Sequence, residues 1–220
     1  KALQLLPQDS QPAFVEDLGG KVLECVESMH GNHVIQKCVE HMRPESVGFV
    51  IAAVSGRAEQ MAAHMYGCRV IQRLLERCPS SMLQGLMEGI LRRVDRLARD
   101  KHGNYVVQCV LQHGRREDKR QIIEVIRRDI VEFAKNKVSS NVVEKCFEVA
   151  TVGEHAQFLV EDRAKLMGTV LGDADDARSP LQQLMHDKFG NYTVQCIIKH
   201  SRGPDREVLR QGGSSRGGGG

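Results

Sequence analysis

The chain has 220 residues, of which 41% are hydrophobic, and its formal net charge is +3. This hydrophobic content suffices for a folded protein, and no apolar run approaches the roughly 20 residues that a membrane-spanning helix needs. The N-terminal residues lack the layout of a signal peptide, which favours the cytosol or the nucleus, and of these we expect a cytoplasmic protein. So small a net charge neither indicates nor excludes a nucleic-acid partner, because the distribution of basic residues matters more than their sum.

One short phrase occurs five times along the chain. The copies are GNHVIQ at 31–36, GCRVIQ at 67–72, GNYVVQ at 103–108, SSNVVE at 139–144 and GNYTVQ at 190–195. The first three steps between copies are 36 residues each, and the last is 51. A fixed period of this length is typical of proteins built from stacked repeats.

Each phrase opens a predicted amphipathic helix, because apolar residues recur at three- and four-residue steps. In the first copy the apolar stripe is Val34, Ile35, Cys38 and Val39. A short apolar stretch precedes the phrase, as at 22–26, 94–98 and 130–134, and another follows it, as at 47–54, 83–91 and 122–126. The sequence therefore predicts an all-α solenoid of three-helix repeats. We expect the glycine that opens four of the copies to stand where the preceding helix ends and the chain turns sharply.

We predict repeat boundaries from this period. The predicted segments are a remnant of a preceding repeat at 1–18, repeats at 19–54, 55–90, 91–126, 127–176 and 177–210, and a flexible Gly/Ser tail at 211–220. The fourth repeat carries an acidic insertion, GDADDARSP at 172–180, which is either a solvated loop or a partner-binding loop. Because 1–18 resembles the end of a repeat and no capping repeat precedes the tail, we expect the chain to be a fragment or the product of an incomplete gene model.

Seven cysteines are spread along the chain without a CxxC pair or a histidine at zinc-finger spacing. Most lie in the predicted apolar stripes, where a reduced cysteine packs as a small hydrophobic residue. We therefore expect no disulfide and no metal site, and the sequence indicates no cofactor.

Each copy also carries three polar or planar residues opposite its apolar stripe. Asn32 and Gln36 are four residues apart and share a helix face, so we expect them to project from the packed helices together with His33. A nucleic-acid base offers an edge that forms hydrogen bonds and two faces that stack, which suits two polar groups with a planar group between them. The candidate RNA-binding residues are Asn32, His33 and Gln36; Cys68, Arg69 and Gln72; Asn104, Tyr105 and Gln108; Ser140, Asn141 and Glu144; and Asn191, Tyr192 and Gln195.

The chemistry of each pair favours a base. An ionised Glu144 only accepts hydrogen bonds, and guanine offers two adjacent donors, so Ser140 with Glu144 favours guanine. An Asn/Gln pair has donors and acceptors, as uracil does. Cys68 with Gln72 leaves room for a purine that lacks the donors of guanine, which favours adenine.

These phrases resemble the RNA-binding helices of the Pumilio (PUF) family. The resemblance implies a right-handed α-α superhelix, an ARM-like crescent in which each repeat binds one base of antiparallel single-stranded RNA. The five repeats resemble the fourth to eighth of that family, because SSNVVEK and the spacer after it are typical of the seventh. The family's pattern then predicts the sequence 5′-UGUAU-3′. It also implies a monomer that binds mRNA 3′ untranslated regions and represses or destabilises the message through a deadenylase or translational co-repressor.

Two other functions are compatible with the sequence. A protein-binding solenoid of the ARM or HEAT type would share the helices, with the Asn/Gln pairs as ordinary polar faces. A nucleolar relative of the PUF proteins would bind RNA without sequence preference. We expect no catalytic residues, because no set of nucleophile, base and orienting group recurs. In three repeats a basic residue directly follows the last candidate RNA-binding residue and either contacts phosphates or is solvated. These residues are Lys37, Arg73 and Lys145.

Overall fold

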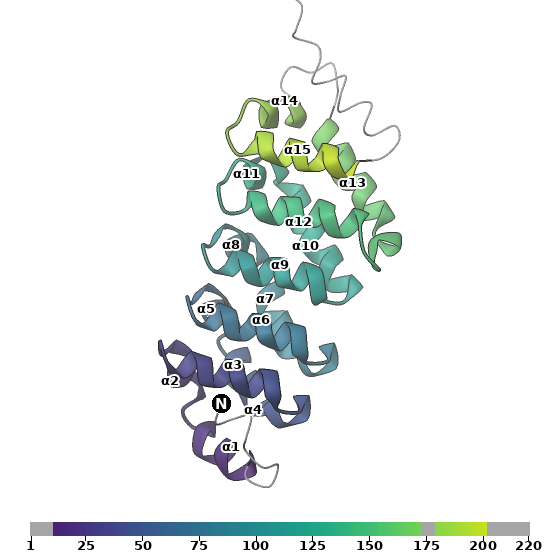
Figure 1. Cartoon of the computed structure of the whole chain (residues 1–220). Coiled ribbons are helices and arrows are strands. Elements are labelled where there is room, and N and C mark those ends of the chain that lie inside the picture. The colour runs from purple at the N-terminus through teal and green to yellow at the C-terminus, as the bar shows by residue number, and fades with distance from the viewer. Residues whose placement is uncertain (1–10, 173–178, 202–220) are drawn as a thin grey trace, which may run out of the picture. The chain divides into compact units, whose positions relative to one another are not determined.

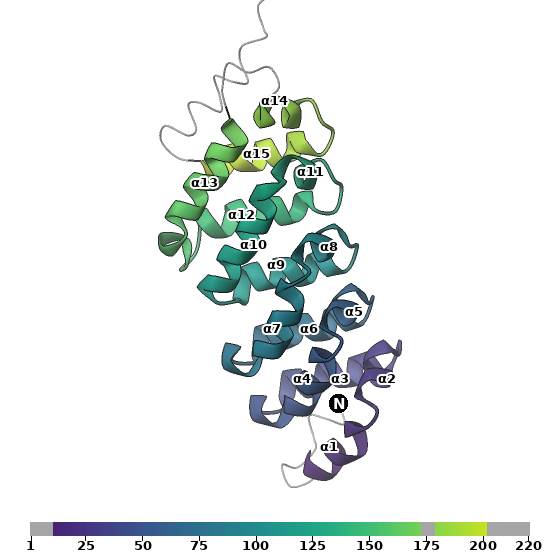
Figure 2. The ribbon, with the colours of Figure 1, turned by 180° about the vertical axis from the view of Figure 1, so that it is seen from behind.

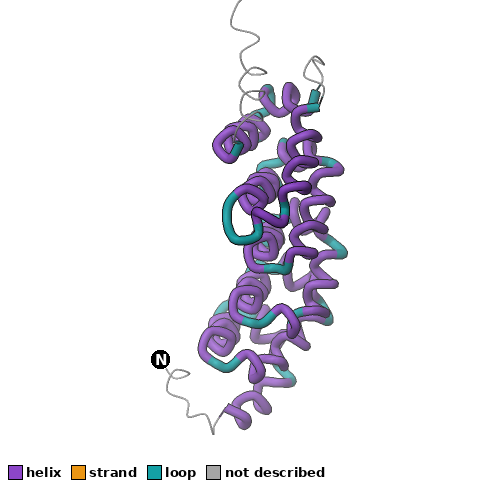
Figure 3. Tube along the Cα trace, turned by 90° about the vertical axis from the view of Figure 1, so that its right-hand side faces the viewer, coloured by secondary structure: helices purple, strands orange, loops and turns teal. Residues whose placement is uncertain are grey.

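The computed structural model describes residues 11–172 and 179–201. Within these ranges the regular segments are α-helices and short 3-10 helices, with no strand (Figure 3). None of the helices in this part of the chain is both long and apolar enough to cross a membrane. Residues 1–10, most of the predicted 172–180 loop and the predicted tail lie outside the described residues. The chain divides into two compact units, residues 1–115 and 116–220.

The first unit begins with α1 (Gln11–Gly19) and continues with helices in a repeating order of lengths. The first repeat contains α2 (Val22–Glu27), α3 (Gly31–His41), η3 (Pro44–Val47) and α4 (Gly48–Ser55). The second contains α5 (Ala58–Ala63), α6 (Gly67–Arg77), η4 (Ser80–Met82) and α7 (Gln84–Leu91). The third begins with α8 (Val94–Arg99) and α9 (Gly103–His113). Each of the first three copies of the phrase therefore opens the middle helix of its repeat, as predicted.

The helices of the first unit form layers. The middle helices α3, α6 and α9 pack side by side (Figure 1), while α4 and α7 pack side by side behind them (Figure 2). The short helices α2, α5 and α8 each pack against the middle helix of their own repeat. This arrangement leaves one face of α3, α6 and α9 uncovered by the α4 and α7 layer.

The second unit has the same kinds of helix. It contains α10 (Arg116–Arg128), α11 (Ile130–Ala134), α12 (Ser140–Thr151), η5 (Ala156–Phe158), α13 (Val160–Leu171), α14 (Pro180–Met185) and α15 (Gly190–His200). The middle helices α12 and α15 pack together, and α10 packs against α13. An ion pair between Arg120 and Asp162, 3.0 Å apart, joins these last two helices.

The cores consist of the apolar stripes predicted from the sequence. In α6 the residues Val70, Ile71, Leu74 and Leu75 are all buried. Burial of such a side chain contributes about 1.5 to 3 kcal/mol, so the stripe rather than helix propensity holds the helix in place. The prediction is wrong for Val34, which is 38% exposed. No middle helix precedes α3 in the described part of the chain, whereas α6 and α9 each follow a packed neighbour.

Candidate RNA-binding surface

A polar residue lies three positions before the opening Gly or Ser of each phrase and fixes the turn that leads into the middle helix. In the third repeat, Asp100 Oδ1 accepts hydrogen bonds from the backbone N–H groups of His102 and Gly103, at 2.8 and 2.7 Å. Backbone N–H groups of the turn are likewise bonded by the side chains of Ser28, His64, Asn136 and Asp187. The hydrogen bond from Gly190, followed by that from Phe189, lowers the pKa of the Asp187 carboxyl. The sequence pattern was not used to predict these turn residues. It does contain them, because a polar residue recurs three positions before the opening Gly or Ser of every phrase.

The opening glycines are needed because the helix start lies against the preceding helix. A Cβ atom at Gly67 would lie 2.5 Å from the carbonyl oxygen of Met61, and one at Gly31 would lie 2.6 Å from that of Cys25. Neither glycine has a positive φ, so the expected sharp turn is not the reason for them. In the fourth copy the equivalent residue is Ser139, which is buried and donates a hydrogen bond from Oγ to the Phe133 carbonyl oxygen at 2.8 Å.

The first of the three predicted reading residues lies deeper than the sequence indicated. Asn32, Cys68, Asn104 and Ser140 are buried, and only Asn191 is half-buried. The four buried side chains donate to the backbone carbonyl three residues earlier, as Asn104 Nδ2 does to Lys101 at 3.1 Å. The expectation that all three residues project is therefore wrong for this position, because the turn before the helix covers it.

The third candidate residue of each set lies at the fifth position after the opening Gly or Ser. In the three Asn/Gln pairs, a hydrogen bond to the first candidate residue holds its side chain in place. In each Asn/Gln pair the glutamine Nε2 donates to the asparagine Oδ1. The distances are 2.8 Å for Gln36, 2.9 Å for Gln108 and 2.7 Å for Gln195. This bond fixes the direction of the glutamine amide, which carries both a donor and an acceptor. In the second repeat Gln72 instead donates to the backbone carbonyl of Cys68 at 3.0 Å.

The second residue of each set is exposed, as predicted. His33, Arg69, Tyr105, Asn141 and Tyr192 all belong to this class. Tyr105 is 57% exposed and Tyr192 is 61% exposed, so neither aromatic ring packs in the core. Exposed planar groups at equivalent positions of adjacent helices are suited to stacking on flat ligands.

A hollow lies between two of these planar groups in the first unit. Its volume is about 410 Å³, and it is lined by Arg69 and Tyr105 together with Gln36, Cys68 and Gln72. The hollow thus brings together predicted residues from three consecutive repeats. Met65, Tyr66, Arg73 and His102 complete its lining.

The second unit differs in that one of its candidate RNA-binding residues is acidic. Glu144 is half-buried, and burial raises the pKa of its carboxyl above the usual range. A buried carboxylate is stabilised when donors approach it, so this position suits a ligand with hydrogen-bond donors.

The three basic residues that directly follow candidate RNA-binding residues form ion pairs with acidic side chains. Lys37 lies 2.5 Å from Glu40 and Lys145 lies 2.8 Å from Glu148, while Arg73 is paired with Glu76. Each pair joins residues three apart on one helix and is partly exposed, so it contributes little to stability.

The fold and this surface define a class of protein, an α-helical solenoid in which four of the five middle helices carry two polar side chains with an exposed residue between them, and α6 carries Cys68 and Gln72 around the exposed Arg69. The model of the Pumilio-family RNA binding repeat matches residues 22–55, 57–91, 93–127, 129–162 and 181–211. The chain therefore belongs to the Pumilio family.

Solved structures of related proteins agree with this assignment. The chain is 31% identical to PUF-8 in complex with PBE-RNA, with a TM-score of 0.86 over 96% of this chain and 59% of that one. It is 29% identical to the Puf3 RNA binding domain bound to a Cox17 RNA 3′ UTR recognition sequence, with a TM-score of 0.83 over 96% of this chain and 63% of the other. The chain thus spans about three fifths of the length of these two relatives. The comparison with curated protein sequences gave no significant match.

Proposed function

We propose that this chain binds single-stranded RNA in a sequence-specific manner, with one base at each middle helix. The observation that carries the proposal is the recurrence of an exposed residue between two polar side chains at equivalent positions of α3, α9, α12 and α15, with Cys68 in place of the first polar residue in α6. A protein-binding solenoid would have no need for this set in every repeat. The RNA complexes of PUF-8 and Puf3 support the proposal, because both proteins share the fold and the family.

The hollow between Arg69 and Tyr105 fits this function in the first unit. A base placed there would lie between two planar groups, with Cys68 and Gln72 along its edge. Stacking of a base on an aromatic side chain contributes about 1 to 3 kcal/mol. We assign adenine to this position and uracil to the Asn32/Gln36 and Asn104/Gln108 pairs, so the first unit would bind the 3′ part of the target, UAU.

The second unit would bind the 5′ part of the target, UG. Guanine presents two adjacent donors, and a half-buried Glu144 carboxylate would accept both. Asn191 and Gln195 would bind the 5′ uracil through the amide pair described above. The proposed target of the five repeats is therefore 5′-UGUAU-3′.

We further propose that the natural targets are 3′ untranslated regions of mRNA, and that binding leads to repression or decay through a recruited deadenylase or co-repressor. The support is that the solved Puf3 and Puf4 domains are bound to 3′ UTR recognition sequences. Cytoplasmic location and a monomeric state belong to the same proposal.

The test is a change of specificity at one base. The double variant Ser140→Asn, Glu144→Gln turns the fourth pair into the Asn/Gln pair of its neighbours. We expect it to prefer 5′-UUUAU-3′ over 5′-UGUAU-3′, reversing a preference of about 10- to 100-fold, or about 1 to 3 kcal/mol.

The matched control is Glu148→Gln, which removes the same charge one turn further along α12 and should leave the preference for guanine intact. A double variant that keeps the guanine preference would refute the assignment of Ser140 and Glu144.

A further inference from the structure

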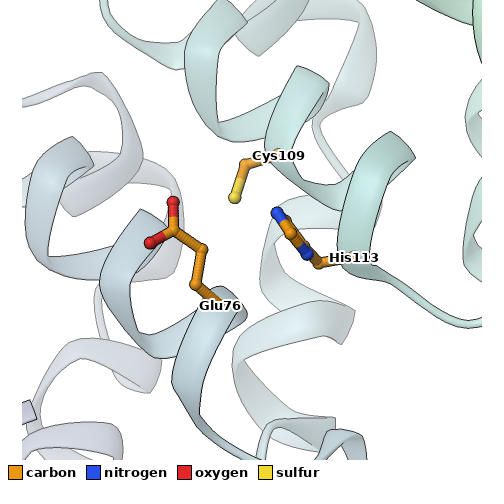
Figure 4. A group of neighbouring side chains, drawn as sticks. All are labelled: Glu76, Cys109 and His113. Atoms are coloured by element: carbon orange, nitrogen blue, oxygen red, sulfur yellow. The ribbon is translucent and has the colours of Figure 1, made fainter. Parts of the chain in front are cut away.

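Three side chains able to bind a metal meet between the middle helices of the second and third repeats. Glu76 comes from α6, and Cys109 and His113 come from α9. One ligand atom from each residue lies within 4.8 Å of the other two. Figure 4 shows the Cys109 sulfur pointing into the space between the Glu76 carboxylate and the His113 ring. Among the described residues, this is the group of three that satisfies the distance.

We propose that Glu76, Cys109 and His113 bind a zinc ion that joins α6 to α9. Zinc is the metal whose usual ligands are a cysteine thiolate, a histidine nitrogen and a carboxylate oxygen. Calcium and magnesium prefer oxygen ligands alone, so a site with sulfur and nitrogen does not suit them. Water would complete a tetrahedral site with three protein ligands.

The positions of the ligands along the helices favour one shared ion. Cys109 and His113 are four residues apart, so they lie on one face of α9. The Cys109 thiol is directed toward α6, where it lies 3.8 Å from the backbone carbonyl oxygen of Gln72. Glu76 is one turn beyond Gln72 on α6, so its carboxylate reaches the same space.

Binding requires small movements that the site permits. Zinc bonds of about 2.0 to 2.3 Å at tetrahedral angles place ligand atoms about 3.3 to 3.8 Å apart, so the ligand atoms need to approach one another by at most about 1.5 Å. Glu76 and His113 are both exposed and can rotate toward the buried Cys109. Arg73, which pairs with Glu76, also lies 4.0 Å from Glu40 and can remain with that carboxylate.

Zinc must also displace the thiol proton. Burial and the nearby Glu76 raise the pKa of the Cys109 thiol to about 12. The Cys109 sulfur–hydrogen bond therefore breaks as the sulfur–zinc bond forms, and the proton passes to solvent.

The same residue types recur at equivalent positions of the second unit and provide a natural control. Glu148 on α12 corresponds to Glu76, and Cys196 and His200 on α15 correspond to Cys109 and His113. In this second set Glu148 is paired with Lys145 at 2.8 Å, and Cys196 Sγ lies 3.4 Å from His200 Nδ1. Its three ligand atoms do not come together as those of the first set do.

The test is metal binding by the reduced, chelator-stripped protein in the absence of RNA. We expect one zinc per chain by competition with a chromophoric chelator, and a thiolate-to-cobalt absorption band when cobalt is used as the probe. Cys109→Ser should abolish the band, and His113→Gln should weaken zinc binding by about 100-fold, since loss of a supporting partner alone costs about 10- to 100-fold.

Cys196→Ser is the matched control and should bind zinc as the parent chain does. Because His113 is exposed, its variant remains informative even if Cys109→Ser does not fold. The proposal would be overturned if His113→Gln bound zinc as tightly as the parent chain. It would also be overturned if Cys196→Ser, which keeps all three proposed ligands, lost zinc binding. Because no RNA is present, either result is independent of the proposed RNA-binding function.

Discussion

The contact between the start of α6 and the preceding helix α5 predicts a large effect for the substitution Gly67→Ala. The added Cβ would lie 2.5 Å from the Met61 carbonyl oxygen and 3.2 Å from the Met61 Cα and carbonyl carbon. All three are backbone atoms, so no side-chain rotation can relieve the contact. The helices must therefore move apart, and the stripe of α6 loses part of its packing.

The magnitude follows from two opposing effects. Overpacking of this kind costs about 1 to 3 kcal/mol, while replacing glycine by alanine lowers the entropy of the unfolded chain and returns about 0.4 to 1 kcal/mol. We expect a net loss of about 1 to 2 kcal/mol, which for a unit of about 100 residues lowers the melting temperature by about 4 to 16 °C.

The assay is thermal and urea unfolding followed by far-ultraviolet circular dichroism, with two comparison variants. Gly168→Ala lies on the exposed face of α13, where a Cβ meets no atom within 4 Å, so it should stabilise the chain by about 0.4 to 1 kcal/mol. Ser139→Ala keeps the Cβ of the fourth copy but removes the hydrogen bond to Phe133, at a cost of about 1 kcal/mol. Equal stabilities of Gly67→Ala and Gly168→Ala would refute the close-approach explanation.

Two further predictions concern RNA binding. Tyr105→Ala should weaken binding of the proposed target by about 1 to 3 kcal/mol, because it removes the stacking of a base on the ring. The urea midpoint should change little, since the ring is exposed. A large loss of stability would instead assign Tyr105 to the core. Because burial raises the pKa of Glu144, its carboxylate takes up a proton as the pH falls from neutral toward that raised pKa. The free protein gains stability from this protonation while the preference for guanine weakens. Titrations of guanine- and adenine-containing RNA across this range should therefore converge, and Glu144→Gln should remove the pH dependence.

The middle helices could be predicted from the sequence because their apolar residues recur at the helical period. The stripe of α6 is buried as expected, and so are most stripe residues of the other copies. Exposure of Tyr105 and Tyr192 also follows from their place opposite the stripe. These features depend on one helix and its own periodicity.

Features that depend on neighbouring segments could not be predicted in the same way. The helical period gives the direction of Asn32 and Asn104 but not their depth, which the preceding turn determines. The role of Gly67 depends on a backbone contact with Met61, which no periodicity contains. The meeting of Glu76 with Cys109 and His113 depends on the packing of α6 against α9, so spacing rules for metal sites within one segment did not indicate it.

The central claim, that the polar residues of the middle helices bind a defined RNA sequence, is tested most directly by competition binding at one fixed salt concentration. The labelled ligand is RNA containing 5′-UGUAU-3′, and the competitors are the same RNA unlabelled and its variant with guanine replaced by adenine. Fixed salt is essential, because contacts to phosphate weaken as salt rises whatever the base sequence. We predict that the adenine variant competes about 10- to 100-fold more weakly. Equal competition by the two RNAs would contradict sequence-specific binding.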